Sequence, residues 1–510
     1  MKQAGLWLLI GFIVMVAAAC NEPAEEGPVL VTLEEPESPF VAVAVWFRVG
    51  SQNDPSGKEG LASLTASLLA EGSTRKLGYS DILSRLYPMA TRYEASVDKE
   101  MTVFRGTVHR DNLEEFYELL RDAILQPAFR PDDFERLKEE QYNYVKRLRR
   151  FSSDEELGKE LLYREIFRGT PYEHPVEGYV KSVESLQLSD VQEFYRRYYV
   201  RNNVVVGLGG GYPADFPERV RKDLAALPTG EVVRVPAPQP QPPDGIRVLI
   251  VEKDTRATAI SLGFPIGVTR SDPDFMPLFL ANSWLGEHRN SASHLYQVIR
   301  DTRGMNYGDY SYIEAFPMGH RRSLPPINVS RRSQIFQIWI RPVSMLGSGD
   351  LHARALFATR AALRELRRLV EQGLSPEEFE TTRDFLRNYT VNYGSTLSRR
   401  LGYALDDVFY GLQPEGFLKR IPAALQALSA DEVNAAVKRH LQADKFWIVF
   451  ITKDAEGLKR MLVGGEETPI TYPTQKPPEV LAEDREIQRY PIPVREENIR
   501  IVSVEEVLEE

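Results

Sequence analysis

Apolar residues in four short stretches predict the strands of two sheets. Residues 40–49 (FVAVAVWFRV) are rich in β-branched and aromatic side chains, which favours a strand. Residues 257–268 (ATAISLGFPIGV) have the same character and are the counterpart of this strand in the second half of the chain. Two further runs, 201–207 (RNNVVVG) and 445–452 (KFWIVFIT), predict a buried strand that closes each half.

Between these strands the spacing of apolar residues changes to that of amphipathic helices. Residues 113–125 and 352–371 show polar and apolar positions at the helical period. Helices and strands are mixed without a strict βαβ rhythm. The pattern predicts an α+β fold in which each sheet is mainly antiparallel and is covered by helices on one face.

Two motifs recur along the chain and indicate a duplicated domain. The outline PDDFERLKEEQYNYV, from residue 131, returns as PEEFETTRDFLRNYT, from residue 376. The outline VQEFYRRYYVRNNVVV, from residue 191, returns as VNAAVKRHLQADKFWIV, from residue 433. Because both pairs are separated by nearly the same interval, we expect two homologous domains.

Composition sets the boundaries of these domains. A proline-rich stretch between residues 228 and 246 favours an extended linker. We therefore predict a first domain over residues 40–227 and a second over residues 247–465. Residues 466–510 are charged and interrupted by prolines, and they predict an extended tail with one short strand near residues 499–504.

The first 39 residues predict an exported, membrane-anchored protein. Lys2 precedes an apolar run, residues 6–19, of the length of a signal peptide and too short to span a membrane. The run ends at Cys20, the only cysteine of the chain, in an arrangement that resembles a bacterial lipoprotein lipobox. This resemblance implies a signal peptide over residues 1–20, lipidation of Cys20, and a polar tether and lead-in over residues 21–39. The alternatives are an uncleaved anchor or an ordinary cleavage site. The expected location is the bacterial cell envelope, facing the periplasm or held at the outer membrane.

Composition and charge indicate a globular protein and limit the kinds of molecule that it binds. The 510 residues are 43% hydrophobic and 27% charged, which is typical of a globular protein of several domains. The net charge of −10 and the lack of a basic block argue against a nucleic-acid partner.

The segment 60–73 (GLASLTASLLAEGS) follows a strand and a loop and has the pattern of a helix. The order strand, RVGSQNDPSGKEGLA, helix and AEGS resembles the insulinase or pitrilysin (M16) family of zinc peptidases, over roughly residues 40–465. In that family this helix carries H-x-x-E-H, whose histidines bind zinc and whose glutamate activates water. Here the resemblance places Ser63 and Ser67 at the histidine positions and Ala66 at the glutamate position.

These replacements remove the zinc chemistry from this chain. Serine hydroxyls are poor zinc ligands, and alanine is not a base. The third ligand position of the family falls near Asn143 and Tyr144, while the glutamates at positions 139 and 140, one turn earlier, are expected to point elsewhere. None of the seven histidines stands four residues from another, so we expect no metal site in this chain. The small-residue face of the helix either packs closely against another element or lines a remnant of the catalytic pocket.

An arginine and a tyrosine in the second half match a further motif of the family. Arg300 and Tyr307, in RDTRGMNY, have the R-x₆-Y spacing of the pair that the family uses to bind the substrate carbonyl, and Gly304 is well placed to end the helix between them. The alternatives are a local ion pair for Arg300 and a sheet aromatic for Tyr307. Arg303 is the competing arginine.

The family also binds peptides along an exposed strand edge. The matching segment here is residues 91–104, and the expected edge includes Glu94, Ala95 and Ser96.

Together these features predict a non-catalytic subunit that binds peptides and pairs with a zinc-bearing M16 homologue. The resemblance implies that zinc is held by that partner, and that hydrolase activity requires it. One alternative is a structural or peptide-binding scaffold of an envelope complex without proteolysis, and another is an independent protease with a divergent site.

Overall fold

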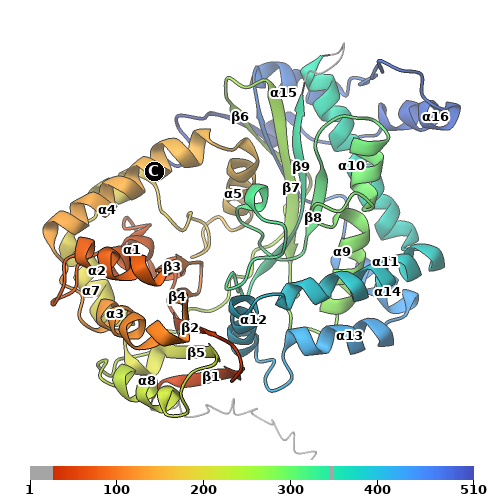
Figure 1. Ribbon diagram of the computed structural model, residues 1–510. Coiled ribbons are helices and arrows are strands. Elements are labelled where there is room, and N and C mark those ends of the chain that lie inside the picture. The colour runs from red at the N-terminus through yellow and green to blue at the C-terminus, as the bar shows by residue number, and fades with distance from the viewer. Residues whose placement is uncertain (1–26, 345–349) are drawn as a thin grey trace, which may run out of the picture.

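The computed structural model describes residues 27–344 and 350–510. The expected signal peptide, Cys20 and most of the tether lie outside the described residues. Two sheets, each with its own helices, lie side by side in the molecule (Figure 1). Among the helices described, none is long and apolar enough to cross a membrane.

The first sheet has five strands in the order β1-β5-β2-β4-β3. Only β1 and β5 are parallel, and the other neighbours are antiparallel. The strands are β1 (Val29–Glu34), β2 (Phe40–Phe47), β3 (Tyr93–Val97), β4 (Thr102–His109) and β5 (Val204–Gly210). The predicted strands at 40–49 and 201–207 are confirmed as β2 and β5. Strand β1, within the segment expected to be only a lead-in, was not predicted.

The second sheet has six strands in the order β11-β6-β10-β7-β9-β8. Strand β6 is parallel to both of its neighbours, and the remaining pairs are antiparallel. The strands are β6 (Arg247–Glu252), β7 (Ala257–Ile266), β8 (Asp309–Tyr312), β9 (Gln334–Ser344), β10 (Trp447–Thr452) and β11 (Ile499–Ser503). Strands β7 and β10 confirm the predictions at 257–268 and 445–452, and the α+β class with two mainly antiparallel sheets is confirmed.

Most helices cover one face of the sheet of their own half. In the first half these are α1 (Leu61–Glu71), α2 (Tyr79–Leu86), α3 (Leu113–Leu125), α4 (Pro131–Asn143), α6 (Val180–Ser185), α7 (Leu188–Tyr198) and α8 (Phe216–Leu224). In the second half they are α9 (Phe275–Gly286), α10 (Leu351–Gln372), α11 (Pro376–Tyr389), α13 (Phe417–Ala427), α14 (Ala430–His440) and α15 (Ala455–Gly464). The two helices predicted in detail are confirmed as α3 and α10.

Two helices are exchanged between the halves. Helix α5 (Asp154–Ile166) packs on β7, β9 and β10 of the second sheet, and α12 (Leu397–Tyr410) packs on β1, β2 and β5 of the first. The expectation that helices cover only one face of each sheet was therefore wrong. The reason lies in β2, which carries apolar side chains on both faces, so a second layer must cover them. A Cβ at Gly207 would lie 3.0 Å from Leu401 Cδ1, so glycine lets α12 approach β5 closely.

The linker and the tail both contact residues of the second half. Residues 228–246 form no helix or strand, as predicted, and the Val235 carbonyl accepts a hydrogen bond from Arg332 at 2.9 Å. The tail contains the predicted strand as β11, but the expectation that the rest is extended was wrong, because α16 (Pro478–Ile487) forms within it. Acidic side chains of α16 pair with second-half arginines, which explains why this polar segment folds onto the domain.

Candidate functional site

Helix α1 is fixed at its beginning by a half-buried carboxylate. The Asp54 side chain accepts hydrogen bonds from the backbone amides of Gly60 (2.8 Å) and Ala62 (2.7 Å), which satisfies donors at the helix N-terminus. Gly60 has φ of 98°, and a Cβ there would lie 2.5 Å from the Glu177 carbonyl oxygen. Gln141 of α4 donates to the carbonyls of Gly60 and Glu177, both at 2.9 Å. The site is therefore rigidly built although its catalytic residues are replaced.

The replaced face of α1 both packs and lines a cavity. Ala66 and Ala70 are buried, whereas Ser63 and Ser67 border a cavity of about 700 Å³. Both interpretations of this face therefore hold for different residues. Asn143 and Tyr144 line the same cavity, so the position expected for the third ligand does face the two serines.

Three glutamates also border this cavity. The sequence pattern predicted that one of them points elsewhere, and it did not identify a second. Glu140 lines it, so the expectation that its direction is wrong was incorrect. Glu71 was missed, although its spacing of four residues from Ser67 puts both on one helical face. Burial, and secondly the charge of Glu140, raise the pKa of Glu71. Glu140 is paired with Arg136 at 3.3 Å, and Glu177 with Arg149 at 3.4 Å.

The chemistry of this set does not match zinc. Serine, asparagine and tyrosine replace imidazole and carboxylate at the ligand positions, and two of the three nearby glutamates, Glu140 and Glu177, are paired with arginines. Within residues 27–344 and 350–510, no three histidine, cysteine, aspartate or glutamate side chains are grouped so that they could hold a metal ion.

Strand β3 lies at one end of the first sheet, as predicted, and borders a second cavity. This cavity, of about 380 Å³, lies between the halves and shares Tyr144 and Glu177 with the first. Ser96 and Val97 of β3 line one side, and Met318 of the second half lines another. Ala95 is half-buried beside them, and the exposed Glu94 pairs with Arg105 at 3.1 Å. The strand edge and the replaced zinc face therefore border two neighbouring cavities that share Tyr144 and Glu177 as lining residues.

Charged groups inside the second cavity connect the halves. Arg331 makes two hydrogen bonds to the Asp98 carboxylate, at 2.6 and 2.8 Å, across the boundary between the halves. Lys99 is buried and donates to the His174 carbonyl, and burial lowers the pKa of its ammonium to about 8. Burial, followed by the charges of Arg105 and Arg399, lowers the pKa of Arg322, which also lines the cavity.

The structure brings Arg300 and Tyr307 together. Arg300 lies in the last turn of a short π-helical segment (Tyr296–Asp301), and Gly304, with φ of 64°, turns the chain as predicted. The Arg300 Cζ atom lies 5.9 Å from the centroid of the Tyr307 ring and 4.8 Å from that of Tyr296. The Tyr307 side chain is 67% exposed. Neither residue is among those that line the cavity at Ser63 and Ser67.

The alternative roles considered for Arg300 and Tyr307, a local ion pair and a sheet aromatic, are instead those of neighbouring residues. Arg303 is buried and forms ion pairs with Glu483 (2.6 Å) and Asp484 (2.8 Å), so it anchors the tail. Tyr310 and Tyr312 are buried aromatics of the second sheet, unlike the exposed Tyr307.

The fold and the replaced motif define the class of protein. A sequence model of the insulinase family, peptidase family M16, matches residues 29–179, and one of the peptidase M16 inactive domain matches residues 185–386. The chain belongs to the M16 family and is a member that lacks the catalytic zinc motif.

Named relatives and a solved structure agree with this assignment. The chain is 23% identical over 463 residues to the "non-peptidase homolog YmxG" of Helicobacter pylori (strain ATCC 700392 / 26695), covering 89% of this chain and 99% of that protein. It is 25% identical over 266 residues to "zinc protease PqqE" of the same strain, covering 50% of this chain and 58% of that protein. The crystal structure of a peptidase M16 inactive domain from Pseudomonas fluorescens shares the fold, with a TM-score of 0.72 and 22% identity over 84% of this chain and 96% of that one.

Proposed function

We propose that this chain is a non-catalytic, peptide-binding subunit that pairs with an H-x-x-E-H homologue and supplies Arg300 and Tyr307 to a shared site. The observation that carries the proposal is that this chain has lost the residues of the zinc site but keeps the arginine and tyrosine of the second motif. The positions of the zinc ligands and base hold Ser63, Ala66 and Ser67, while Arg300 and Tyr307 lie close together, with Arg300 half-buried and Tyr307 67% exposed.

A half-buried guanidinium beside an exposed phenol suits a role toward another chain. Both can donate hydrogen bonds to a peptide carbonyl as negative charge develops on its oxygen. Arg300 and Tyr307 do not line the cavity at the replaced zinc face of their own chain. They act on a substrate if a partner chain presents an intact zinc site to them. The two H. pylori relatives support this reading, because one strain encodes both a named zinc protease and a named non-peptidase homologue.

The peptide contact is assigned to the edge of β3. Backbone groups along Glu94, Ala95 and Ser96 lie on the end strand of the sheet, where a peptide could add as a further strand. The adjoining cavity, lined by Ser96 and Val97, leaves room for side chains of that peptide.

The test is reconstitution with an H-x-x-E-H homologue from the same genome. We expect the pair to hydrolyse peptides, and Arg300→Ala or Tyr307→Phe to lower kcat about a hundredfold without preventing association. Tyr87→Phe is the matched control, since Tyr87 is 86% exposed in the first half. Unchanged rates in both variants would contradict the assigned role.

We also propose that lipidation of Cys20 anchors the subunit in the cell envelope. Incorporation of a labelled fatty acid in cells, and its loss in Cys20→Ser, would support this. If cell fractionation finds the wild-type protein among the soluble periplasmic proteins, this proposal is contradicted.

The scaffold function is the competing proposal. It is favoured if the chain is recovered in an envelope assembly that contains no H-x-x-E-H protein, and if no such homologue is encoded beside it.

A further inference from the structure

Arg322 is a cation of the second half that lies beside the edge of β3. It follows a short helical turn (Gly319–Arg321) and lines the second cavity, of about 380 Å³, together with Ser96 of that strand. Two hydrogen bonds fix its backbone. Its amide donates to the Gly319 carbonyl at 3.2 Å, and its carbonyl oxygen lies 3.0 Å from His288 Nε2. The side chain is only half-buried, so a molecule in the cavity can reach it.

The other charged side chains that line the second cavity have partners within the chain. These contacts are the ion pairs Arg331–Asp98 (2.6 Å), Lys159–Glu156 (3.3 Å), Arg149–Glu160 (2.6 Å) and Arg149–Glu177 (3.4 Å), and the hydrogen bond from Lys99 to the His174 carbonyl. Within the part of the chain that the structure describes, no carboxylate forms an ion pair with Arg322. Arg322 therefore brings to this cavity an accessible positive charge without a paired carboxylate.

Neighbouring charges make a further carboxylate favourable at this position. Burial, and next the charges of Arg105 and Arg399, lower the pKa of Arg322, so two nearby cations repel its guanidinium. The carboxylates that oppose this repulsion, Glu156 and Glu94, are each paired with another cation. The planar guanidinium matches the geometry of a carboxylate, with which it can form two parallel hydrogen bonds.

The alternation of side chains along β3 decides which part of a bound peptide faces Arg322. Ala95 and Val97 pack against the core of the first half, so Glu94 and Ser96 point to the opposite face of the strand. A peptide that adds to β3, the end strand of its sheet, alternates in the same way. Every second side chain of this peptide therefore points to the face on which Ser96 lines the cavity.

We infer that Arg322 selects peptides with an acidic residue, whose side-chain carboxylate it binds in the second cavity. The inference rests on the proposed peptide contact at β3 and names the class of peptide that this contact accepts. A glutamate or aspartate side chain accepts hydrogen bonds from the guanidinium and supplies the missing negative charge. A neutral side chain of the same size leaves the repulsion among the arginines in place.

The test measures binding of two peptides to the single full chain by fluorescence anisotropy. Both peptides consist of alternating threonine and valine around one central residue, which is glutamate in the first and glutamine in the second. Both carry an N-terminal fluorescein and a C-terminal amide, so one side-chain carboxylate is their only difference. We expect the glutamate peptide to bind about tenfold more tightly, because a hydrogen bond between two charged groups is stronger than one to a neutral amide.

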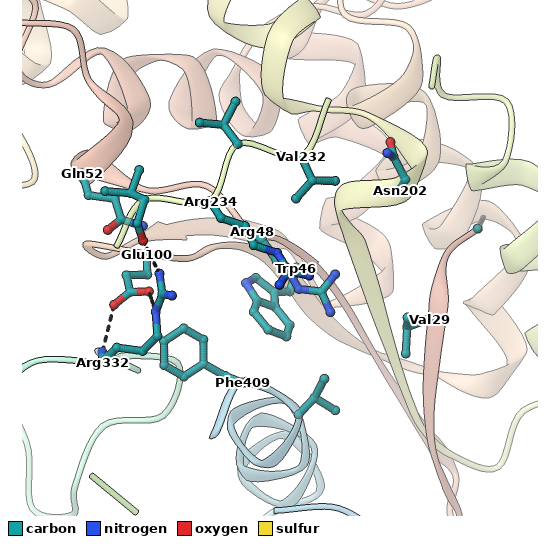
Figure 2. Close-up of a pocket in the computed structure, with 14 residues that line it drawn as sticks. Val29, Trp46, Arg48, Gln52, Glu100, Asn202, Val232, Arg234, Arg332 and Phe409 are labelled. Atoms are coloured by element: carbon teal, nitrogen blue, oxygen red, sulfur yellow. Dashed lines mark hydrogen bonds and ion pairs between the residues drawn. The ribbon is translucent and has the colours of Figure 1, made fainter. Parts of the chain in front are cut away.

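Variants assign this preference to a residue. Arg322→Gln should bind the glutamine peptide as the wild type does, which shows that it is folded, and should lose the preference for glutamate. Arg322→Lys keeps the charge and should retain part of the preference. The matched control is Arg234→Gln, because Arg234 is an exposed arginine that lines a different pocket, beside Trp46 and Phe409 (Figure 2). This control should keep the full preference.

The outcomes separate this inference from the function on which it rests. If the wild type binds both peptides equally, or if Arg322→Gln keeps the preference for glutamate, the role of Arg322 is wrong while the peptide contact stands. If neither peptide binds the wild-type chain, the peptide contact at β3 is itself contradicted, and the inference fails with it.

Discussion

Replacing His288 with glutamine should remove part of the acid sensitivity of the fold. The His288 imidazole is buried among aromatic rings of the second half. Its Nδ1 lies 2.7 Å from the Tyr312 hydroxyl and its Nε2 lies 3.0 Å from the Arg322 carbonyl oxygen. A neutral ring satisfies both contacts, since Nε2–H donates to the carbonyl and Nδ1 accepts from the hydroxyl. Burial, the largest cause, lowers the pKa of His288 to about 4.

The sign and size of the effect follow from linkage. Below the ordinary histidine pKa of about 6.5 the unfolded chain takes up a proton that the folded chain does not, so stability falls as pH drops toward the folded pKa of about 4. Between about pH 7 and about pH 4.5 this one group costs roughly 2.4 kcal/mol of unfolding free energy. His288→Gln cannot titrate, so its loss of stability over this range should be smaller by that amount.

The assay is urea unfolding, followed by circular dichroism at the two pH values. Carboxylates titrate in both proteins and cancel in the difference. His109→Gln is the control, because the His109 side chain is 42% exposed. An equal loss of stability in wild type and His288→Gln would refute the reasoning.

Two further substitutions test how the site is held in place. Leu405→Ala, in the exchanged helix α12, should lower the unfolding free energy by about 2–5 kcal/mol because the side chain is fully buried on the first sheet. Leu481→Ala, at a position 39% exposed, should cost much less, and similar urea midpoints for the two would count against close packing of α12. Asp54→Ala should cost about 1–3 kcal/mol, since two amides at the start of α1 lose their acceptor; unchanged thermal stability would mean that Asp54 does not cap this helix.

Local sequence patterns predicted the elements, but not the contacts between the halves. The strands β2, β5, β7 and β10 were visible because β-branched runs have a clear signature. The exchange of α5 and α12 was not, since an amphipathic helix shows that it buries a face but not which sheet receives it. Strand β2 is apolar on both faces, which indicates that both faces of its sheet are covered. A strand in a sheet with one face exposed to solvent alternates apolar and polar residues.

In the candidate site, too, the sequence predicted the local motifs but not the long-range contacts. Motif spacing placed Ser63 and Ser67, and it also identified Arg300 and Tyr307 as a pair, which the structure brings together. It could not show that Arg303 is buried in an ion-pair cluster, because the acidic partners come from α16, about 180 residues later. Long-range charge pairing leaves no local pattern in a sequence.

The content of bound zinc tests the central claim most directly. The claim is that the face of α1 formed by Ser63, Ala66 and Ser67 neither holds zinc nor activates water, and that a partner chain does both. Metal analysis of the purified chain alone should find far less than one zinc ion per chain, and analysis of the reconstituted pair should find about one per pair. Near-stoichiometric zinc in the single chain, with peptidase activity that a chelator abolishes, would contradict the account.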